Sequence, residues 1–205
     1  MFYQFLNFKK CTAGRILNFF LLFFCCSSSF SQVTTQQEYI DSLVVELKRT
    51  PRDSTKILLL EKIGHTYSTL DPKKGFEYAL QANQLALELN LKQREGSSLA
   101  IIAINLAAAG SYDMAIEYNK ESIEIYKSVN YPKGIAAVNA NLSQVYLKLG
   151  NYSSALDCNF SALEIYDSFE EHRSKAIVLE NIGSIYYELN EFSKSGKYYE
   201  QALEL

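Results

Sequence analysis

Histidine and cysteine are the side chains of this sequence best suited to metal binding or nucleophilic chemistry, and they are few and scattered. The two histidines are His65 and His172, and Cys158 is the one cysteine after residue 26. A metal site needs several ligands at helical or loop spacing, and these residues stand far apart in the chain. We therefore expect no metal site, and we interpret Cys158 as a small buried hydrophobic residue.

Motifs of catalysis and of phosphate binding are also missing from the sequence. The nine glycines are scattered, and neither a Gly-x-Ser-x-Gly elbow nor a His-Glu-x-x-His pair occurs. We expect no enzymatic activity and no cofactor in these residues. The net charge of −3, without a long basic stretch, argues against a nucleic-acid surface. With 48% hydrophobic and 21% charged residues, the 205-residue chain is expected to fold rather than to be disordered.

The N-terminal segment, 1–31, has the pattern of a secretory signal peptide. Basic residues come first, an apolar run from Ile16 to Cys26 follows, and small polar residues precede the expected cleavage between Ser31 and Gln32. Two alternatives stay open: a permanent membrane anchor, for which this run is short, and lipid modification at Cys25 or Cys26. The sequence predicts export to the periplasm or cell envelope.

An internal repeat decides the fold prediction. Similar residues recur every 40 positions along the chain. One such series is Gly75, Ala115, Ala155 and Ser195, and another is Ala82, Ser122, Ala162 and Ala202. Within each copy, apolar residues recur at steps of three and four, which indicates two helices joined by a short turn such as Gly150-Asn151. Small residues inside the first helices, among them Gly64 and Gly183, predict positions where another helix crosses closely.

This repeat resembles the tetratricopeptide repeat, on the motif Leu142, Tyr146, Gly150-Asn151-Tyr152, Ala155, Ala162-Leu163. The usual unit of that family has about 34 residues. The period of 40 residues seen here, from Gly75 to Ala115, resembles a variety with longer helices. The resemblance implies an all-α, right-handed α-solenoid of antiparallel helix pairs. We place the array in residues 54–205, with repeats at 54–96, 97–134, 135–175 and an incomplete 176–205. Residues 32–53 are expected to form a leading helix that covers the first repeat, and Asp53 is suited to cap the helix that follows.

In this family the first helix of each repeat lines the concave surface, where a protein or peptide ligand binds. We therefore expect a binding groove that contains the following residues: His65, Ile104, Ala108, Asn141, Gln144, Lys148, Asn181, Ser184, Tyr187 and Glu188. Asn141 and Asn181 are suited to hydrogen-bond an extended peptide backbone, and equally to bond a neighbouring helix. For each single position, an ordinary solvent-facing helix surface is the competing interpretation.

The order of leader, leading helix and repeats resembles the N-terminal region of bacterial envelope sensors that carry a histidine kinase or a DNA-binding output domain. The sequence stops at Leu205 inside an expected helix, so we expect a longer natural protein. The main hypothesis is a non-catalytic binding module in the sensory or scaffolding part of such a protein. The alternatives are a stand-alone exported assembly factor and an accessory domain of an enzyme. A membrane connection would come only from the leader or from a segment after residue 205.

The leader can be tested on the native protein. The chain recovered from its own cell envelope should begin at Gln32, which N-terminal sequencing checks. An intact mass slightly below 23.3 kDa would favour the stand-alone exported factor. A species that retains residues 1–31 would contradict the predicted cleavage. A species several times heavier would identify these residues as the front of a larger protein.

Overall fold

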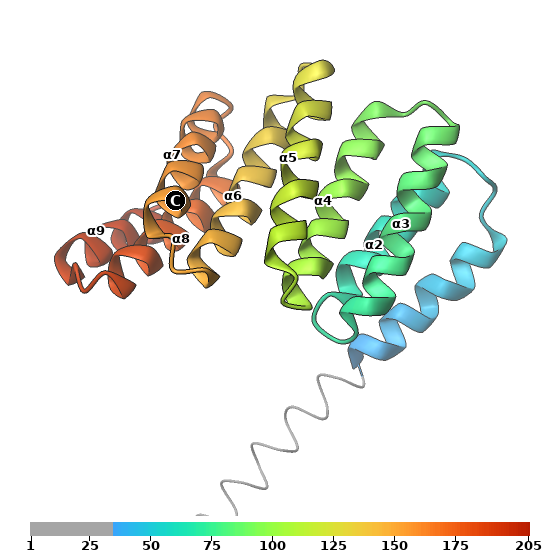
Figure 1. The fold of residues 1–205 in the computed structure, drawn as a ribbon, viewed down its shortest axis with the longest axis horizontal. Helices are drawn as coiled ribbons and strands as arrows, with labels where there is room; N and C mark the ends of the chain where they lie inside the picture. Colours follow the sequence, from blue (N-terminus) through green and yellow to red (C-terminus); the bar gives the residue numbers. More distant parts are fainter. Residues whose placement is uncertain (1–34) are drawn as a thin grey trace, which may run out of the picture. The chain divides into compact units, whose positions relative to one another are not determined.

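The computed structural model describes residues 35–205, so the predicted signal peptide lies outside the described residues. In residues 35–205 every regular element is a helix, and nine helices are present. The first spans residues 35–49, close to the predicted leading helix, whose capping role stays a prediction. The remaining eight, labelled in Figure 1, are α2 (Ser54–Tyr67), α3 (Pro72–Glu88), α4 (Lys92–Ala108), α5 (Tyr112–Ser128), α6 (Pro132–Lys148), α7 (Tyr152–Ser168), α8 (His172–Glu188) and α9 (Phe192–Leu203).

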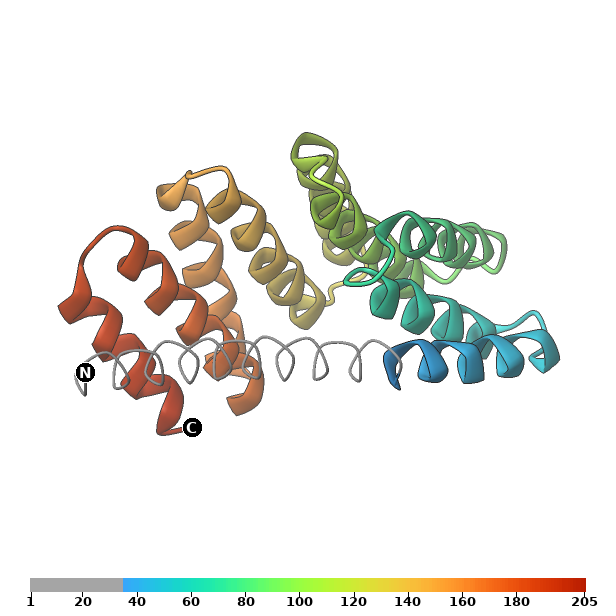
Figure 2. The ribbon, with the colours of Figure 1, turned by 90° about the horizontal axis from the view of Figure 1, so that it is seen from below.

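Helices α2 to α9 form four hairpins, and each hairpin packs on the next. Every helix contacts its neighbours in sequence, and α2, α4, α6 and α8 also contact one another in series. We call these four the inner helices and α3, α5, α7 and α9 the outer helices, since outer helices make no such contacts with one another. Figure 2 shows the successive pairs side by side. The predicted all-α solenoid of antiparallel helix pairs is confirmed.

Left-handed residues end most of these helices. Gly110 and Gly150 have φ values of +81° and +70° in the turns between an inner and an outer helix. Asn90 and Asn130, with φ of 53° and 49°, occupy the turns between repeats. Glycine and asparagine tolerate this conformation best, which explains why these residue types recur there. Glu170, with φ of 53°, is the residue least suited to its turn.

Small residues mark close crossings between the inner and outer helix of a repeat, as the sequence predicted. A Cβ atom added to Gly64 of α2 would lie 3.0 Å from the carbonyl oxygen of Gly75 in α3. Gly183 of α8 instead makes room for a side chain, because an added Cβ would lie 3.0 Å from the ring of Tyr199 in α9. The two helices of these repeats can therefore approach this closely only because the inner-helix residue at the crossing is a glycine.

The first and last repeats share an aromatic arrangement. Tyr67 and Tyr78 stack with ring centroids 5.8 Å apart, and Lys74 Nζ lies 5.7 Å from the Tyr67 ring. Three repeats later Tyr186 and Tyr198 stack at 5.4 Å, and Lys194 lies over Tyr186. Stacked rings with a cation on one face are mutually stabilising. Each stack joins an inner helix to its outer helix.

The structure corrects two details of the sequence interpretation. The predicted repeat boundaries after residues 96, 134 and 175 fall about one turn inside α4, α6 and α8. Gly96 and Gly134, which lie at two of these predicted boundaries, are packing positions inside helices, since an added Cβ on either would lie 2.8 Å from the Tyr126 ring. The polar segment Glu170-Glu171-His172-Arg173 suggests a loop in the sequence, but His172 is the first residue of α8. The predicted cap at Asp53 is confirmed by its acceptance of the Thr55 N–H at 2.9 Å.

A buried carboxylate connects the first two repeats. Glu61 of α2 is 5% exposed, accepts the Ser98 hydroxyl at 3.1 Å and pairs with Arg94 at 3.2 Å, both from α4. Burial raises the pKa of Glu61 above its ordinary value of 4.5, although Arg94 and the hydrogen bonds act in the opposite direction. The folded chain therefore holds the Glu61 proton more tightly than the unfolded chain does.

Two glycine substitutions should have opposite effects on stability. Gly75→Ala would place a Cβ 1.8 Å from Asn105 Oδ1 and 2.8 Å from the Gly64 carbonyl oxygen, so we expect destabilisation. Overpacking of this kind costs about 1–3 kcal/mol. Gly196→Ala in α9 meets no atom within 4 Å and should stabilise by about 1 kcal/mol through helix propensity. Urea denaturation measures both, and equal effects of the two substitutions would contradict the close crossing.

Glu61→Gln should change how stability depends on pH. The wild-type contribution of the Glu61 proton is fully present below pH 4.5 and is lost as the pH rises through the raised pKa. The glutamine variant keeps an acceptor for Ser98 without this titration. The free energy of unfolding of the variant, relative to wild type, should therefore increase from pH 4.5 to pH 7. A difference that stays constant over this range would contradict the raised pKa.

Candidate functional site: a hollow between the inner helices

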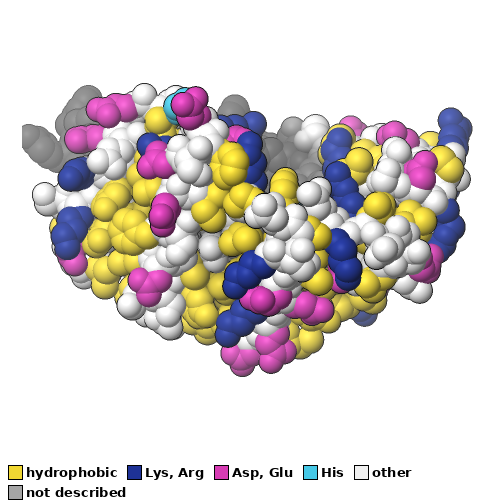
Figure 3. Space-filling view, turned by 90° about the horizontal axis from the view of Figure 1, so that it is seen from above, with side chains coloured by type: hydrophobic (Ala, Val, Ile, Leu, Met, Phe, Trp, Pro, Cys, Tyr) yellow, Lys and Arg dark blue, Asp and Glu magenta, His cyan; other side chains and the backbone are white. Residues whose placement is uncertain are grey.

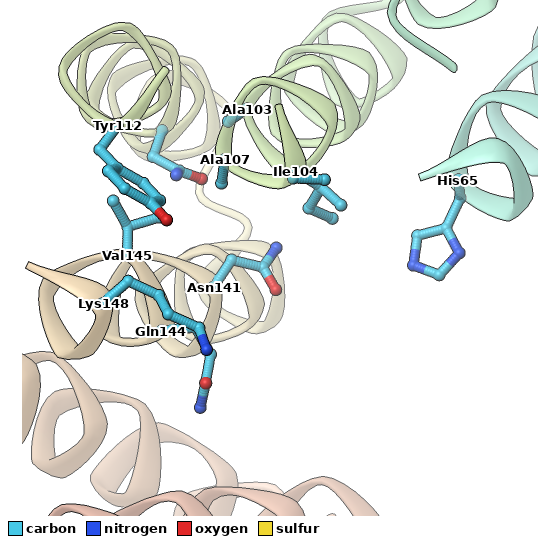
Figure 4. Close-up of a pocket in the computed structure, with 11 residues that line it drawn as sticks. His65, Ala103, Ile104, Ala107, Tyr112, Asn141, Gln144, Val145 and Lys148 are labelled. Carbon is cyan, nitrogen blue, oxygen red and sulfur yellow. The ribbon is translucent and has the colours of Figure 1, made fainter. Parts of the chain in front are cut away.

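A hollow of about 450 Å³ lies between α4 and α6, with α5 at its floor. Figure 4 shows its lining, in which the α6 residues face Ile104 and His65 across the open space. Tyr112 packs against Val145 at one end. The hollow is lined by His65, Ala103, Ile104, Ala107, Ala108, Tyr112, Asn119, Asn141, Gln144, Val145 and Lys148. The inner helices therefore carry a recess between the second and third repeats.

The recess exists because the second repeat carries alanine where the third carries larger residues. Ala103 and Ala107 of α4 occupy the registers that Ser143 and Leu147 occupy one repeat later in α6. A methyl group at position 107 leaves space that a leucine side chain occupies in the next repeat. The small residues at these two registers therefore favour an open gap at the α4–α6 junction.

Asn119 at the floor of the hollow has an unsatisfied buried oxygen. Its side chain is 1% exposed, and its Nδ2 donates to the Ala115 carbonyl of the same helix at 2.9 Å. Its Oδ1 has no hydrogen-bond partner in the described part of the chain. In the third repeat, the Oδ1 of the equivalent Asn159 is also unpaired, but its Nδ2 donates to the Ser143 hydroxyl at 2.6 Å, whereas Ala103 offers Asn119 no hydroxyl. An unpaired buried acceptor costs about 1–3 kcal/mol, so a ligand donor here would remove a penalty.

The rim of the hollow is polar and lacks acidic groups. Asn141, Gln144 and Lys148 lie along α6, and within residues 35–205 their side chains make no hydrogen bond or ion pair with the chain. His65 faces them from α2 (Figure 4). Neither Asp nor Glu is among the 11 lining residues. Apolar walls with a few free polar groups are the usual composition of a ligand site.

The structure brings six of the ten predicted groove residues together at this hollow: His65, Ile104, Ala108, Asn141, Gln144 and Lys148. The other four, Asn181, Ser184, Tyr187 and Glu188, lie on α8. Ser184 Oγ lies 3.0 Å from the Tyr199 hydroxyl, so it contributes to packing. Tyr187 is 58% exposed and meets Phe192 edge to face at 5.5 Å. In Figure 3, apolar side chains gather over the C-terminal helices, between charged ones.

Sequence reasoning missed the floor of the hollow. Tyr112 and Asn119 belong to the outer helix α5, and Ala103, Ala107 and Val145 are not among the predicted groove residues. A signal for them was present in the repeat, since Asn119 and Asn159 share a register while Ala103 departs from Ser143. Comparison of the copies at each register would have located the recess.

The described residues offer no assembled metal centre or membrane span. No group of three potential ligands among His, Cys, Asp and Glu lies close together in residues 35–205. Burial raises the pKa of Cys158 to about 11, so this thiol stays protonated at neutral pH. Of the described helices, none combines the length and the apolar character needed to cross a bilayer.

Stacked helix pairs with a recess on the inner helices define a helical-repeat solenoid, a class whose extended concave surface binds partners. A family model described as Tetratricopeptide repeat matches residues 96–168 and 134–205. These matches cover more than half of the chain. The chain therefore belongs to the tetratricopeptide repeat family.

Solved structures of low sequence identity share the fold. A Rap protein complexed with competence and sporulation factor is 20% identical with a TM-score of 0.74, over 84% of this chain and 50% of that one. A putative kinesin light chain with repeats from Podosopora anserina is 14% identical with a TM-score of 0.59, over 84% and 88% of the two chains.

A signal transduction ATPase with a tetratricopeptide repeat sensor, from Pyrococcus horikoshii, is 18% identical with a TM-score of 0.66, over 82% of this chain and 27% of that one. This chain thus spans about half of the Rap protein and about a quarter of the ATPase. A search of curated proteins found no significant match.

Proposed function

We propose that this chain is a non-catalytic module that binds a protein or peptide along its inner helices. The observation that carries the proposal is the hollow between α4 and α6, where free polar side chains of α6 lie at the rim of a recess with apolar walls. Side chains of this kind are available to a partner without breaking bonds inside the module. The complex of a similarly folded Rap protein with competence and sporulation factor supports a binding role.

We further propose that the module works in the cell envelope, as the sensory or scaffolding part of a signalling protein. The basic and apolar leader in residues 1–31 supports export. The tetratricopeptide repeat sensor of the signal transduction ATPase offers a precedent for a sensory role of this fold. Binding would act through complementarity across several repeats, and a small change in superhelical pitch would transmit it.

The binding role can be tested with paired variants. The full chain, cross-linked in an envelope fraction of its source cells, should capture a partner that is then purified for calorimetry. Gln144→Ala combined with Tyr187→Ala should weaken the affinity of this partner about tenfold or more, because buried aromatic and polar anchors dominate interface energies. Helical content by circular dichroism should stay unchanged.

Glu117→Ala combined with Glu121→Ala is the matched control, because both side chains are exposed on the outer helix α5. This pair should leave the affinity within about twofold, as expected for surface positions outside an interface. Equal affinity of wild type and the Gln144/Tyr187 variant would exclude the inner helices as the binding surface.

A further inference from the structure

We propose that the hollow between α4 and α6 accepts a carboxamide side chain, Gln or Asn, from an extended peptide that carries an acidic residue nearby. This inference rests on the proposed function and names the ligand class of the same site. Three features of the lining support it: the amide at its floor, its walls and the charge of its rim.

The amide of Asn119 at the floor determines the polar group of the ligand. Its Oδ1 lacks a donor, as do the Oδ1 atoms of Asn105 and Asn159. The Nδ2 of Asn119, which carries two N–H groups, has one acceptor, the Ala115 carbonyl. Asn105 of the inner helix α4 differs, because its Nδ2 has two acceptors, the carbonyls of Gly64 and Ile101. Asn119 therefore presents one acceptor and one donor, which a single carboxamide group complements with its own N–H and C=O.

Charged side chains fit this position poorly. A carboxylate would bring an acceptor against the Asn119 oxygen, and a lysine or arginine would enter a lining whose charged side chain is Lys148. The side chain that enters must therefore be neutral and must carry a donor.

The walls of the hollow determine which groups of the inserted side chain can lie between its carboxamide and the peptide backbone. The methyl groups of Ala103 and Ala107, together with Val145 and the Tyr112 ring, form apolar walls next to Asn119, and Ala103 and Val145 are buried. The methylene groups of a glutamine or asparagine suit such walls, because their burial removes apolar surface from water. Serine and threonine offer a donor but little reach.

The rim of the hollow determines which charge the bound peptide should carry next to its inserted side chain. Lys148 is exposed and forms no ion pair within residues 35–205, and His65 stands opposite it. In the next repeat, Glu188 takes the register of Lys148, so the positive charge is particular to this junction. A carboxylate next to the inserted side chain would meet Lys148, which favours an acidic peptide over a neutral or basic one.

The neighbouring repeats supply the substitutions that test this site. Ala107→Leu copies Leu147 and should fill the hollow from a half-buried position. Ala103→Ser copies Ser143 and should give the Asn119 amide an internal partner. Lys148→Glu reverses the charge at the rim. All three occur naturally at equivalent registers of this chain, so the variants are expected to fold, and thermal melting verifies this.

A random library of dodecapeptides displayed on phage is selected against the full-length chain, and enriched peptides are synthesised and titrated by fluorescence anisotropy. We expect enriched peptides to contain Gln or Asn near Asp or Glu. Replacement of the carboxamide residue by Ala, or by the matching acid, should weaken binding about tenfold, as expected for lost hydrogen bonds to a buried group. Ala107→Leu should weaken the same peptide at least as much, and Lys148→Glu should shift selection toward basic peptides.

Three outcomes would overturn this inference. The first is a set of enriched peptides that lack a carboxamide, and the second is an Ala107→Leu variant that binds them as tightly as wild type does. A library that yields no binder is the third, while the partner capture described above still decides the proposed function. Peptides that lose affinity with Gln144→Ala and Tyr187→Ala, but keep it with Ala107→Leu, would retain the inner helices as the binding surface and reject the hollow as the specificity site.

Discussion

The close approach of the inner and outer helix within each repeat is the constraint on which the rest of the array depends. Gly64 meets the backbone of α3, and Gly183 meets the ring of Tyr199, at distances that leave little space for another carbon atom. At Gly183 the small inner residue leaves room for a large outer ring, whereas Gly64 meets the small residues Gly75 and Ala79 of α3. Because each hairpin is held this way, its remaining faces are free to pack on the next pair.

The recess between α4 and α6 also depends on residue size where an inner and an outer helix meet. At the second repeat the inner residue is Ala103 and the outer one is Asn119, so the inner position is smaller than Ser143 while the outer position keeps its amide. In the third repeat, serine and asparagine satisfy each other in part. In the second, the amide stays incompletely bonded beside open space. The candidate site is thus a local departure from the repeat rather than an addition to it.

Periodicity alone predicted the helix pairs, since registers such as Gly75, Ala115, Ala155 and Ser195 report which faces are buried. The boundaries were harder to predict, because the repeat spacing fixes the length of a unit but not the residue at which its first helix begins. Six of the ten predicted groove residues surround the hollow, because the family resemblance identified the inner helices. Its floor was missed because Tyr112 and Asn119 come from the outer helix α5, which the family resemblance does not assign to the groove.

The regular length of the units has an evolutionary consequence. Helices α3 to α8 each contain 17 residues, and the later hairpins start at Lys92, Pro132 and His172, always one repeat length apart. Duplication or loss of one such block in the gene would leave the flanking blocks in register, because each touches only its neighbours. The Lys74–Tyr67–Tyr78 stack and its counterpart at Lys194, Tyr186 and Tyr198 are consistent with copying of this kind. Lineages carrying this gene are therefore expected to differ by whole blocks, while point changes such as serine to alanine at one register diversify what each copy can hold.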